Sequence, residues 1–437
     1  MHRRHFIRDF SAAAIALSST GTAFAMGEKG SGDDYGVSST KQNRITHIGK
    51  RSLEEIRSMF REELFEKTIP LWKKNGVDWK YGGFLPYFND NGEVTNYNKR
   101  LYHQGRVLWL YSYFYNNFDK DDYHLRAAKA GYDFLTKYCM LDNYDWCTEV
   151  TREGEVVTPF FDIYPGVYMV LGLGEYYKAT GSEEALDLAI KTAYRVNEVI
   201  LSPHYQAQGH GPYYEPGTVR LGTWLHFLST LTPLLKYTND SGIERIARMC
   251  VKYMLRYHWQ PEFGVAFETL QRDLTPHTND YLMDLNAREV HNFHSLQAAW
   301  MCMDEALRED SREMFREAMY FGQSHLEKCW YKADDGREGI ISLYRPDRDD
   351  PFEGSDIVTP YVNKEIFVLC LLALEHSHEQ WAVDFFDRSF SIAYETPFNW
   401  PYRGTLHQPR GVMFSLEILD RMIERGGRVS DFLDERS

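Results

Sequence analysis

The chain has 437 residues, and its 63 acidic side chains outnumber its 49 basic ones, which gives a formal net charge of −14. A surface this acidic repels nucleic acids and anionic lipids, so neither is expected as a partner, and a neutral or mostly neutral ligand is favoured. Hydrophobic residues make up 43% of the chain and aromatic residues 15%, enough for a large core and for flat apolar faces around a ligand.

The first 25 residues predict an export signal. Arg3 and Arg4 are followed by Phe6, by a weakly apolar run rich in Ala and Ser, and by an Ala-Phe-Ala sequence ending at Ala25, the pattern of a twin-arginine signal peptide. The run is too short and too polar to span a membrane. We expect cleavage after Ala25, a periplasmic or secreted location, and a disordered tether over residues 26–48, which are rich in Gly, Ser and Asp.

From residue 49 to residue 430 the apolar residues follow the helical period of 3.6. In the first such segment Leu53, Ile56 and Phe60 share one face, and Ser52 with Glu55 forms a capping box. The pattern predicts twelve helices, over residues 52–68, 103–118, 122–139, 165–179, 182–200, 222–237, 240–257, 291–307, 310–330, 361–376, 378–393 and 408–424.

The links between these helices alternate in length. Short links such as "TGS" and "TND" follow the even-numbered helices and predict antiparallel hairpins, whereas long loops follow the odd-numbered ones. Six hairpins in series predict one all-α domain, a closed (α/α)6 barrel. The alternative is a linear helical-repeat solenoid, but no repeat of fixed period is visible. The loops over 79–94, 144–157 and 258–273 predict short β-hairpins at the barrel mouth, where the even-numbered helices begin.

Motifs for metals, nucleotides and disulfides are sparse. None of the six cysteines forms a CxxC pair, so no zinc site is predicted. We expect buried thiols, with Cys139 and Cys147 as the one pair close enough in sequence to form a disulfide. There is no GxGxxG after a strand and no P-loop, so no cofactor is expected.

Titratable and polar residues recur near the start of every even-numbered helix. In a closed ring these starts lie at one end, so the side chains are expected to converge on one cavity. Each has a structural explanation on its own, but packing does not require six such contributions, and an unpaired buried charge is costly. The residues are His103, Gln104, Arg106, Asp162, Tyr164, His226, His291, His294, Asn363, Lys364, Glu365 and His407.

Histidines in such a cavity suit proton transfer at carbon, because imidazole is both base and conjugate acid near neutral pH. Two histidines on opposite faces of a carbon invert a stereocentre, and one alone moves a proton between neighbouring carbons, which interconverts an aldose and a ketose. Either reaction needs a carbon acidified by a carbonyl, as in an open-chain sugar, and an arginine such as Arg106 to stabilise the enediolate. A metal pair at His291 and His294 is less favoured, because no carboxylate lies at a partner spacing.

Four segments together resemble a known family. They are "GGFLPYFNDNGEV" with "KRLYHQGRVLWLYS", then "LHFLSTL", "HSLQAAW" and "RGTLHQPRGVMFSLEIL", and they span residues 79–422. In order and spacing the chain resembles the N-acylglucosamine 2-epimerase family, which includes cellobiose 2-epimerases and mannose or sulfoquinovose isomerases. The resemblance implies an (α/α)6 barrel and an isomerase acting on a mono- or oligosaccharide. We expect a monomer or homodimer.

The resemblance also implies roles for individual residues. His294 and His407 match the two acid/base histidines, Arg106 matches the substrate-binding arginine, and His226 matches a histidine that helps to bind and open the sugar. The remaining residues expected to contact substrate are Glu365, Trp400, Tyr361, Gln297 and His103.

The sequence departs from the family pattern at several of these positions. Gln297 replaces a glutamate three residues after the first acid/base histidine, which follows Phe293 rather than glycine. Ser229 stands where a glutamate follows the sixth-helix histidine, and Pro360-Tyr361 replaces a tryptophan pair. With two carboxylates lost and Lys364 gained, the pocket is expected to be more positive, which favours a sugar carrying an acidic, phosphate or sulfonate group.

Two alternative functions are also consistent with the sequence. A glycan hydrolase or lyase built on the same barrel shape would act through acidic residues such as Asp162 and Glu365. A sugar-binding protein without catalysis would be consistent with the change from glutamate to Gln297. Substitution of His294 and His407, followed by measurement of proton exchange at C2 of a sugar, separates these alternatives from an isomerase.

Overall fold

Helices dominate the computed structural model, which describes residues 44–89, 92–205, 217–277, 288–357, 361–395 and 406–434. These residues form twelve helices. The first runs through α1 (Leu53–Glu62), a π-helical segment (Glu63–Thr68) and α2 (Ile69–Asn75). The others are α3 (Leu101–Asn117), α4 (Asp122–Tyr138), α5 (Tyr164–Thr180), α6 (Glu183–Ile200), α7 (Leu221–Leu235), α8 (Ser241–Lys252) with a π-helical end (Tyr253–Tyr257), α10 (Asn292–Arg308), α11 (Arg312–Cys329), α12 (Tyr361–His376), α13 (Gln380–Tyr394) and α14 (His407–Glu424).

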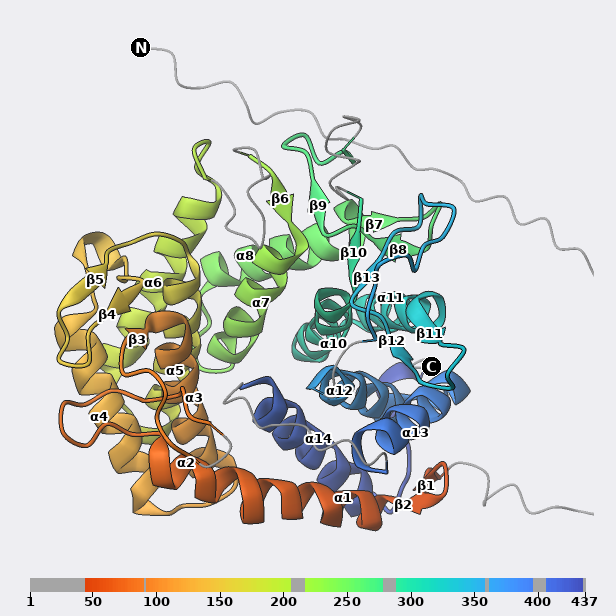
Figure 1. The fold of residues 1–437 in the computed structure, drawn as a ribbon, viewed down its shortest axis with the longest axis horizontal. Coiled ribbons are helices and arrows are strands. Elements are labelled where there is room, and N and C mark those ends of the chain that lie inside the picture. The colour runs from red at the N-terminus through yellow and green to blue at the C-terminus, as the bar shows by residue number, and fades with distance from the viewer. Residues whose placement is uncertain are drawn as a thin grey trace, which may run out of the picture. The chain divides into compact units, whose positions relative to one another are not determined.

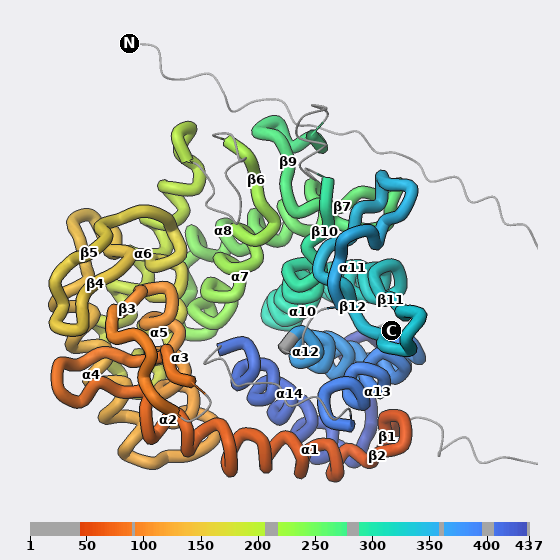
Figure 2. Tube along the Cα trace, in the orientation of Figure 1, coloured from red at the N-terminus to blue at the C-terminus, as the bar shows by residue number. Residues whose placement is uncertain are grey.

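The helices form two concentric layers (Figure 1). Helices α3, α5, α7, α10, α12 and α14 surround the axis, and the first helix, α4, α6, α8, α11 and α13 lie outside them (Figure 2). Each inner helix packs against the outer helix that follows it, from α3 with α4 to α12 with α13, while α14 packs against α1. The predicted (α/α)6 barrel is confirmed. Five pairs are hairpins in series, and the sixth joins the two ends of the domain.

The two layers differ in the distribution of their apolar residues. Inner helix α7 is buried along nearly its whole length, from Leu221 to Leu234, because it has neighbours on every side. Outer helix α8 buries one stripe that contains Ile243, Ile246 and Cys250, and it exposes its polar side. The apolar pattern of each helix therefore specifies its layer.

The first helix continues past the point where the sequence predicted its end. Pro70 lacks an amide hydrogen and signals a stop at residue 68, but the helix passes it and runs to Asn75. The π-helical turn accommodates the proline: the amide of Ile69 donates to the carbonyl of Leu64, one residue further back than in an α-helix. The same turn directs Glu63 into the protein, where it is buried.

Short strands lie at the mouth of the barrel, as predicted. Strands β3 (Lys99–Arg100), β6 (Val219–Arg220) and β10 (Val290–His291) each lead directly into an inner helix. They pair antiparallel with β4 (Glu149–Val150), β9 (Thr269–Leu270) and β13 (Leu343–Tyr344), which come from later loops. The remaining antiparallel pairings join β1 (His47–Ile48) to β2 (Arg51–Ser52), β4 to β5 (Val156–Thr158), β7 (Trp259–Gln260) to β8 (Val265–Ala266), and β11 (Trp330–Lys332) to β12 (Glu338–Ile340). Strands β3, β6 and β10 therefore set the direction in which α3, α7 and α10 begin.

The predicted export signal and most of the predicted tether, residues 1–43, lie outside the described residues. Residues 44–48 pack against the end of the chain, where the amide of Ile45 donates to the carbonyl of Gly427 at 2.7 Å. All six cysteines are buried thiols, Cys139 and Cys147 included. Among the described helices, none combines the length and the apolar character needed to cross a bilayer.

Candidate active site

The predicted site residues lie near the N-terminal ends of the inner helices, where the structure describes them. Arg106 and His103 lie on α3, His226 on α7, His294 and Gln297 on α10, Glu365 on α12 and His407 on α14. His103 packs edge-on against the rings of Tyr87 and Tyr102, at 5.1 and 4.9 Å between centroids. Trp400 and the side chain of Tyr361 lie outside the described part of the chain.

His407, the first residue of α14, lies against a buried carboxylate. Its Nδ1 is 3.4 Å from Oε1 of Glu365, and Nε2 of Gln297 lies 3.3 Å from the same ring nitrogen. On the other side of the ring, Nη1 of Arg106 lies 3.4 Å from Nε2. With its proton on Nδ1, toward Glu365, the imidazole presents a lone pair at Nε2.

Three donors hold the carboxylate of Glu365, which is fully buried. The indole of Trp300 donates to Oε2 at 2.8 Å, the amide of Gln297 donates to Oε1 at 3.1 Å, and Arg410 donates to Oε1 as well. Burial alone would raise the pKa of Glu365, but the charge of Arg410 and the hydrogen bonds from His407 and Gln297 lower it to about 2. Glu365 is therefore an anion that orients His407.

A chain of hydrogen bonds leads from Arg106 on α3 through Tyr168 to His226 on α7. Arg106 donates to the hydroxyl of Tyr168 on α5, and this hydroxyl lies 2.8 Å from Nδ1 of His226. The guanidinium is sandwiched between two rings, 4.3 Å from the centroid of Tyr102 and 4.0 Å from that of Tyr168. Arg106 forms no ion pair with a described carboxylate, so its charge is available to a ligand.

His294 has a carboxylate partner of its own. Its Nδ1 lies 2.9 Å from Oε2 of Glu268, and Arg220 donates to Oε1 of the same carboxylate at 3.0 Å. Glu268 is on the segment between β8 and β9, and Arg220 ends β6, so the pairing of β6 with β9 brings them together. Gly222 makes this approach possible, because a Cβ there would lie 2.9 Å from Cε1 of His294.

The electrostatics of the two histidine–carboxylate pairs keep both carboxylates ionised. Burial alone would raise the pKa of Glu268, yet His294 and Arg220 hold it well below its usual range. For His407, burial together with the charges of Arg106 and Arg410 lowers the pKa to about 3, against the opposing effect of Glu365. His407 is thus a neutral imidazole at neutral pH.

The prediction that Lys364 makes the pocket more positive is wrong. Lys364 and Glu365 are adjacent on α12 and point in different directions. The ammonium of Lys364 lies 2.7 Å from Oε2 of Glu63 in the π-helical turn and also donates to Tyr394. The carboxylate of Glu63 therefore neutralises the charge of Lys364, and this ion pair joins α12 to the first helix of the outer layer.

Several residues of the site were not predicted from the sequence. Glu268 is the most important, because it supplies a carboxylate to His294 although position 297 holds glutamine. Tyr168 and Arg410 were also missed, and each contacts two of the predicted residues. The acidic residue proposed for a hydrolase, Asp162, accepts a hydrogen bond from the backbone amide of Tyr164 at 2.9 Å, which is a helix-start contact.

Taken together, the geometry defines a class of protein: an (α/α)6 barrel with two histidine–carboxylate pairs and an arginine near the N-terminal ends of its inner helices. The chain belongs to the N-acylglucosamine 2-epimerase family, whose model matches residues 82–336, more than half of the chain. This membership confirms the resemblance seen in the sequence and places the chain among sugar epimerases and isomerases.

The curated relatives of the chain are distant in sequence. The cellobiose 2-epimerase of Dictyoglomus turgidum is 25% identical over 296 residues, which cover 64% of this chain and 73% of that protein. The human N-acylglucosamine 2-epimerase is 23% identical over 277 residues, covering 61% of this chain and 62% of that protein. The chain thus matches somewhat less than two thirds of the length of the human relative.

Solved structures share the fold. A sugar epimerase from a ruminal bacterium superposes with a TM-score of 0.69 at 18% identity, covering 84% of this chain and 99% of that one. A D-mannose isomerase gives a TM-score of 0.68 at 16% identity, covering 82% and 97%. A family 76 glycoside hydrolase is similar at a TM-score of 0.56, 10% identity and coverage of 85% and 78%. At these identities the likeness establishes the fold alone.

Proposed function

We propose that the protein interconverts sugars by histidine-mediated proton transfer at C2 of the open-chain aldose, through an enediolate. One observation carries the proposal: His294 and His407 each lie against a buried glutamate, on separate inner helices. Between them lie Arg106 and His226, joined through Tyr168. Two such histidines suit transfer to and from opposite faces of one carbon.

His407 acts as the base in this proposal. Its low pKa keeps the imidazole neutral at neutral pH, and with the Nδ1 proton directed to Glu365 the basic nitrogen is Nε2. Glu365 then stabilises the imidazolium that forms when the proton arrives. As the C2–H bond breaks, its electron pair forms the C1–C2 double bond, and the carbonyl oxygen at C1 becomes an oxyanion. Arg106, next to Nε2 of His407, is placed to stabilise that oxyanion.

The second proton transfer decides the product. Delivery of a proton to C2 by His294 from the opposite face gives the C2 epimer as the carbonyl re-forms at C1. Return of the proton to C1, with the O2 proton passing to O1 as the carbonyl forms at C2, gives the ketose. Glu268 supports His294 in this step by accepting a hydrogen bond from its Nδ1. The neutral His226, with its Nδ1 occupied by Tyr168, has Nε2–H free to donate to a sugar oxygen.

The charge of the substrate follows from which cations remain available. Lys364 is committed to Glu63, and Arg410 to Glu365, so neither offers its charge to a sugar substituent. Among the residues that the structure describes, Arg106 is the cation beside Nε2 of His407. We therefore propose a sugar whose reacting end is uncharged. An acidic group is accommodated only where it reaches Arg106.

The test is deuterium exchange at C2. The mature chain is incubated in D2O with a panel of aldoses, and NMR follows loss of the C2 proton and formation of epimer or ketose. His407→Asn and His294→Asn should each slow exchange by at least about 100-fold. His376→Asn, a buried histidine bonded to Ser430 at the far end of α12, serves as the matched control and should leave exchange unchanged. Normal exchange in both site variants would refute the proposal.

The alternatives predict other results. A hydrolase using Glu365 as general acid requires that carboxyl group to be protonated, whereas its pKa is lowered to about 2. A binding protein without catalysis would bind sugars and exchange no protons. We also propose that the chain acts in the periplasm or outside the cell after removal of residues 1–25, which mass spectrometry of the exported protein would test.

A further inference from the structure

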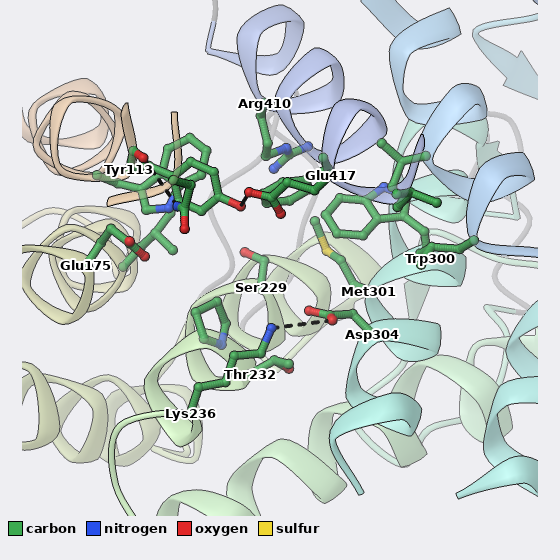
Figure 3. Close-up of a pocket in the computed structure, with 18 of the residues that line it drawn as sticks. Tyr113, Glu175, Ser229, Thr232, Lys236, Trp300, Met301, Asp304, Arg410 and Glu417 are labelled. Atoms are coloured by element: carbon green, nitrogen blue, oxygen red, sulfur yellow. Dashed lines mark hydrogen bonds and ion pairs between the residues drawn. The ribbon is translucent and has the colours of Figure 1, made fainter. Parts of the chain in front are cut away.

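A cavity of about 250 Å³ lies on the barrel axis at the end opposite the histidines. All six inner helices contribute to its walls, mostly through residues in their middle and C-terminal parts, with Arg410 from the first turn of α14 (Figure 3). Ligand pockets usually measure about 300–1,000 Å³, so this space suits a molecule the size of one sugar ring and is too small for an oligosaccharide. We call it the axial cavity.

Aromatic side chains line the axial cavity. Trp109 of α3, Trp300 of α10 and Phe414 of α14 all line it, and both tryptophans lie edge-on to Phe414, with centroids 6.0 and 5.6 Å away. The indole N–H of Trp300 is already used by Glu365. Aromatic faces of this kind pack well against the apolar faces of a sugar or cyclitol ring.

The polar groups of the cavity are paired in a way that favours an uncharged ligand. The ammonium of Lys236 lies 3.6 Å from Asp304, and that of Lys178 lies 3.8 Å from Glu175 (Figure 3 shows the first pair). Arg410 and Arg421, which also line the cavity, are paired with Glu365 and Glu375, and Glu417 accepts a hydrogen bond from Tyr113, so every lining cation has a carboxylate partner. The hydroxyls, amide and carboxylates that line the cavity present donors and acceptors to a ligand with many hydroxyl groups.

Two buried carboxyl groups of the cavity already accept hydrogen bonds. Burial raises the pKa of Glu175 and that of Glu417. Glu417 accepts from Tyr113 at 2.6 Å, and Glu175 accepts from Asn116 at 2.7 Å.

The axial cavity adjoins the candidate active site through two residues. Arg410 and Trp300 line its inner end, and both donate to the carboxylate of Glu365. Glu365 in turn contacts His407. A molecule in the cavity would touch the side chains that hold this glutamate in place.

We propose that the axial cavity is a second binding site, separate from the histidine site, for an uncharged polyhydroxylated molecule the size of a monosaccharide. The aromatic walls, the paired charges and the volume carry this inference. Binding there does not depend on the proposed reaction. One further consequence does rest on the proposed function: a molecule bound in the axial cavity would change turnover by displacing Arg410 and, through it, Glu365.

The test uses methyl β-D-glucopyranoside, whose locked ring cannot open to a carbonyl and so cannot react. Calorimetry and saturation-transfer NMR measure its binding to the mature chain at millimolar concentration. Trp109→Leu removes one aromatic wall, and Leu372→Trp fills the cavity from α12. Both changes should weaken binding by at least about tenfold. Trp79→Leu, at a tryptophan that is 55% exposed outside the cavity, is the matched control and should bind normally.

A second readout needs no cavity variant. In the unmodified protein the indole NMR signals of Trp109 and Trp300 should shift on addition of the glycoside, while that of Trp79 should not. Absence of binding, or binding that both cavity variants retain, would overturn the proposal. Binding that Arg106→Lys abolishes and the cavity variants retain would place the glycoside in the histidine site and would overturn it too. The glycoside cannot react, so this experiment measures binding alone. A failure of the proposed reaction would appear in the deuterium-exchange experiment and would leave the binding result unchanged.

Discussion

Glu268→Gln tests the least expected part of the site, the carboxylate partner of His294. The wild-type carboxylate is 2% exposed and accepts from His294 at 2.9 Å and from Arg220 at 3.0 Å. Glutamine keeps one acceptor oxygen and replaces the other by an amide that cannot accept. One partner therefore loses a charge-assisted hydrogen bond worth about 1.5–3 kcal/mol.

The expected loss of activity follows from that free energy. If this free energy no longer stabilises the transition state of proton transfer, C2 exchange in D2O slows by about 10- to 150-fold, because each 1.36 kcal/mol is a factor of ten in rate. The variant should also be less stable by up to about 3–5 kcal/mol, since Arg220 is left buried with half of its partner. Urea unfolding measures this second effect.

A matched control separates the two effects. Glu375 is also 2% exposed and is held by Arg421 at 2.7 and 2.8 Å, near the C-terminal end of α12. Glu375→Gln should cost similar stability and leave exchange unchanged. If Glu268→Gln exchanges within about twofold of the wild-type rate, Glu268 does not support His294 and the reasoning is wrong.

The pH dependence of stability tests the same contact between Glu268 and His294. The pKa of Glu268 is lower in the folded protein than the unfolded value of about 4.3. Its contribution to the free energy of unfolding is therefore fully present above about pH 5 and is lost as pH falls toward the folded pKa. The stability gap between wild type and Glu268→Gln should narrow at acid pH. A gap that widens on acidification would contradict the assignment.

Three further predictions follow from the same contacts. Gln297→Glu places a negative charge 3.3 Å from His407 and should raise the pKa of that histidine, so the acid limb of the pH–rate profile moves to higher pH by at least about one unit. Lys364→Met leaves Glu63 buried and unpaired and should cost about 3–5 kcal/mol in urea unfolding, while adding Glu63→Gln should recover much of it. Because all six cysteines are thiols, a reducing agent should leave the Tm of the protein unchanged.

The helical period predicted the barrel well, because inner and outer helices bury their apolar residues in regular patterns. Residues 361–376 were predicted as a helix and form α12 with the same bounds. The first helix was predicted to end at residue 68 but runs to Asn75, because a π-helical turn carries it past Pro70 and the apolar period does not reveal that turn. Residues 1–43, with the predicted signal, lie outside the described structure.

The histidines were easier to find than their partners. His294 and His407 stand near helix starts, where a titratable residue among apolar ones attracts attention. Glu268 lies between two strands in a loop without helical periodicity, and it meets His294 only through the long-range pairing of β6 with β9. No local pattern could have predicted that contact.

Adjacent residues on a helix posed a different difficulty. Lys364 and Glu365 differ by about 100° in direction on a helix, and the sequence alone does not say which faces the axis. The partner of Lys364, Glu63, is 301 residues away and is directed inward by the π-helical turn. The inference of a more positive pocket failed because that pairing was invisible in the sequence.

The measurement that bears most directly on the proposed function is C2 proton exchange in D2O by the wild-type protein and by His407→Asn. We predict that the wild-type protein exchanges the C2 proton of at least one aldose and forms its epimer or ketose, and that His407→Asn exchanges it at least about 100-fold more slowly while still binding the sugar. Equal exchange by the two proteins, or sugar binding by the wild type with no exchange for any aldose tested, would contradict the account.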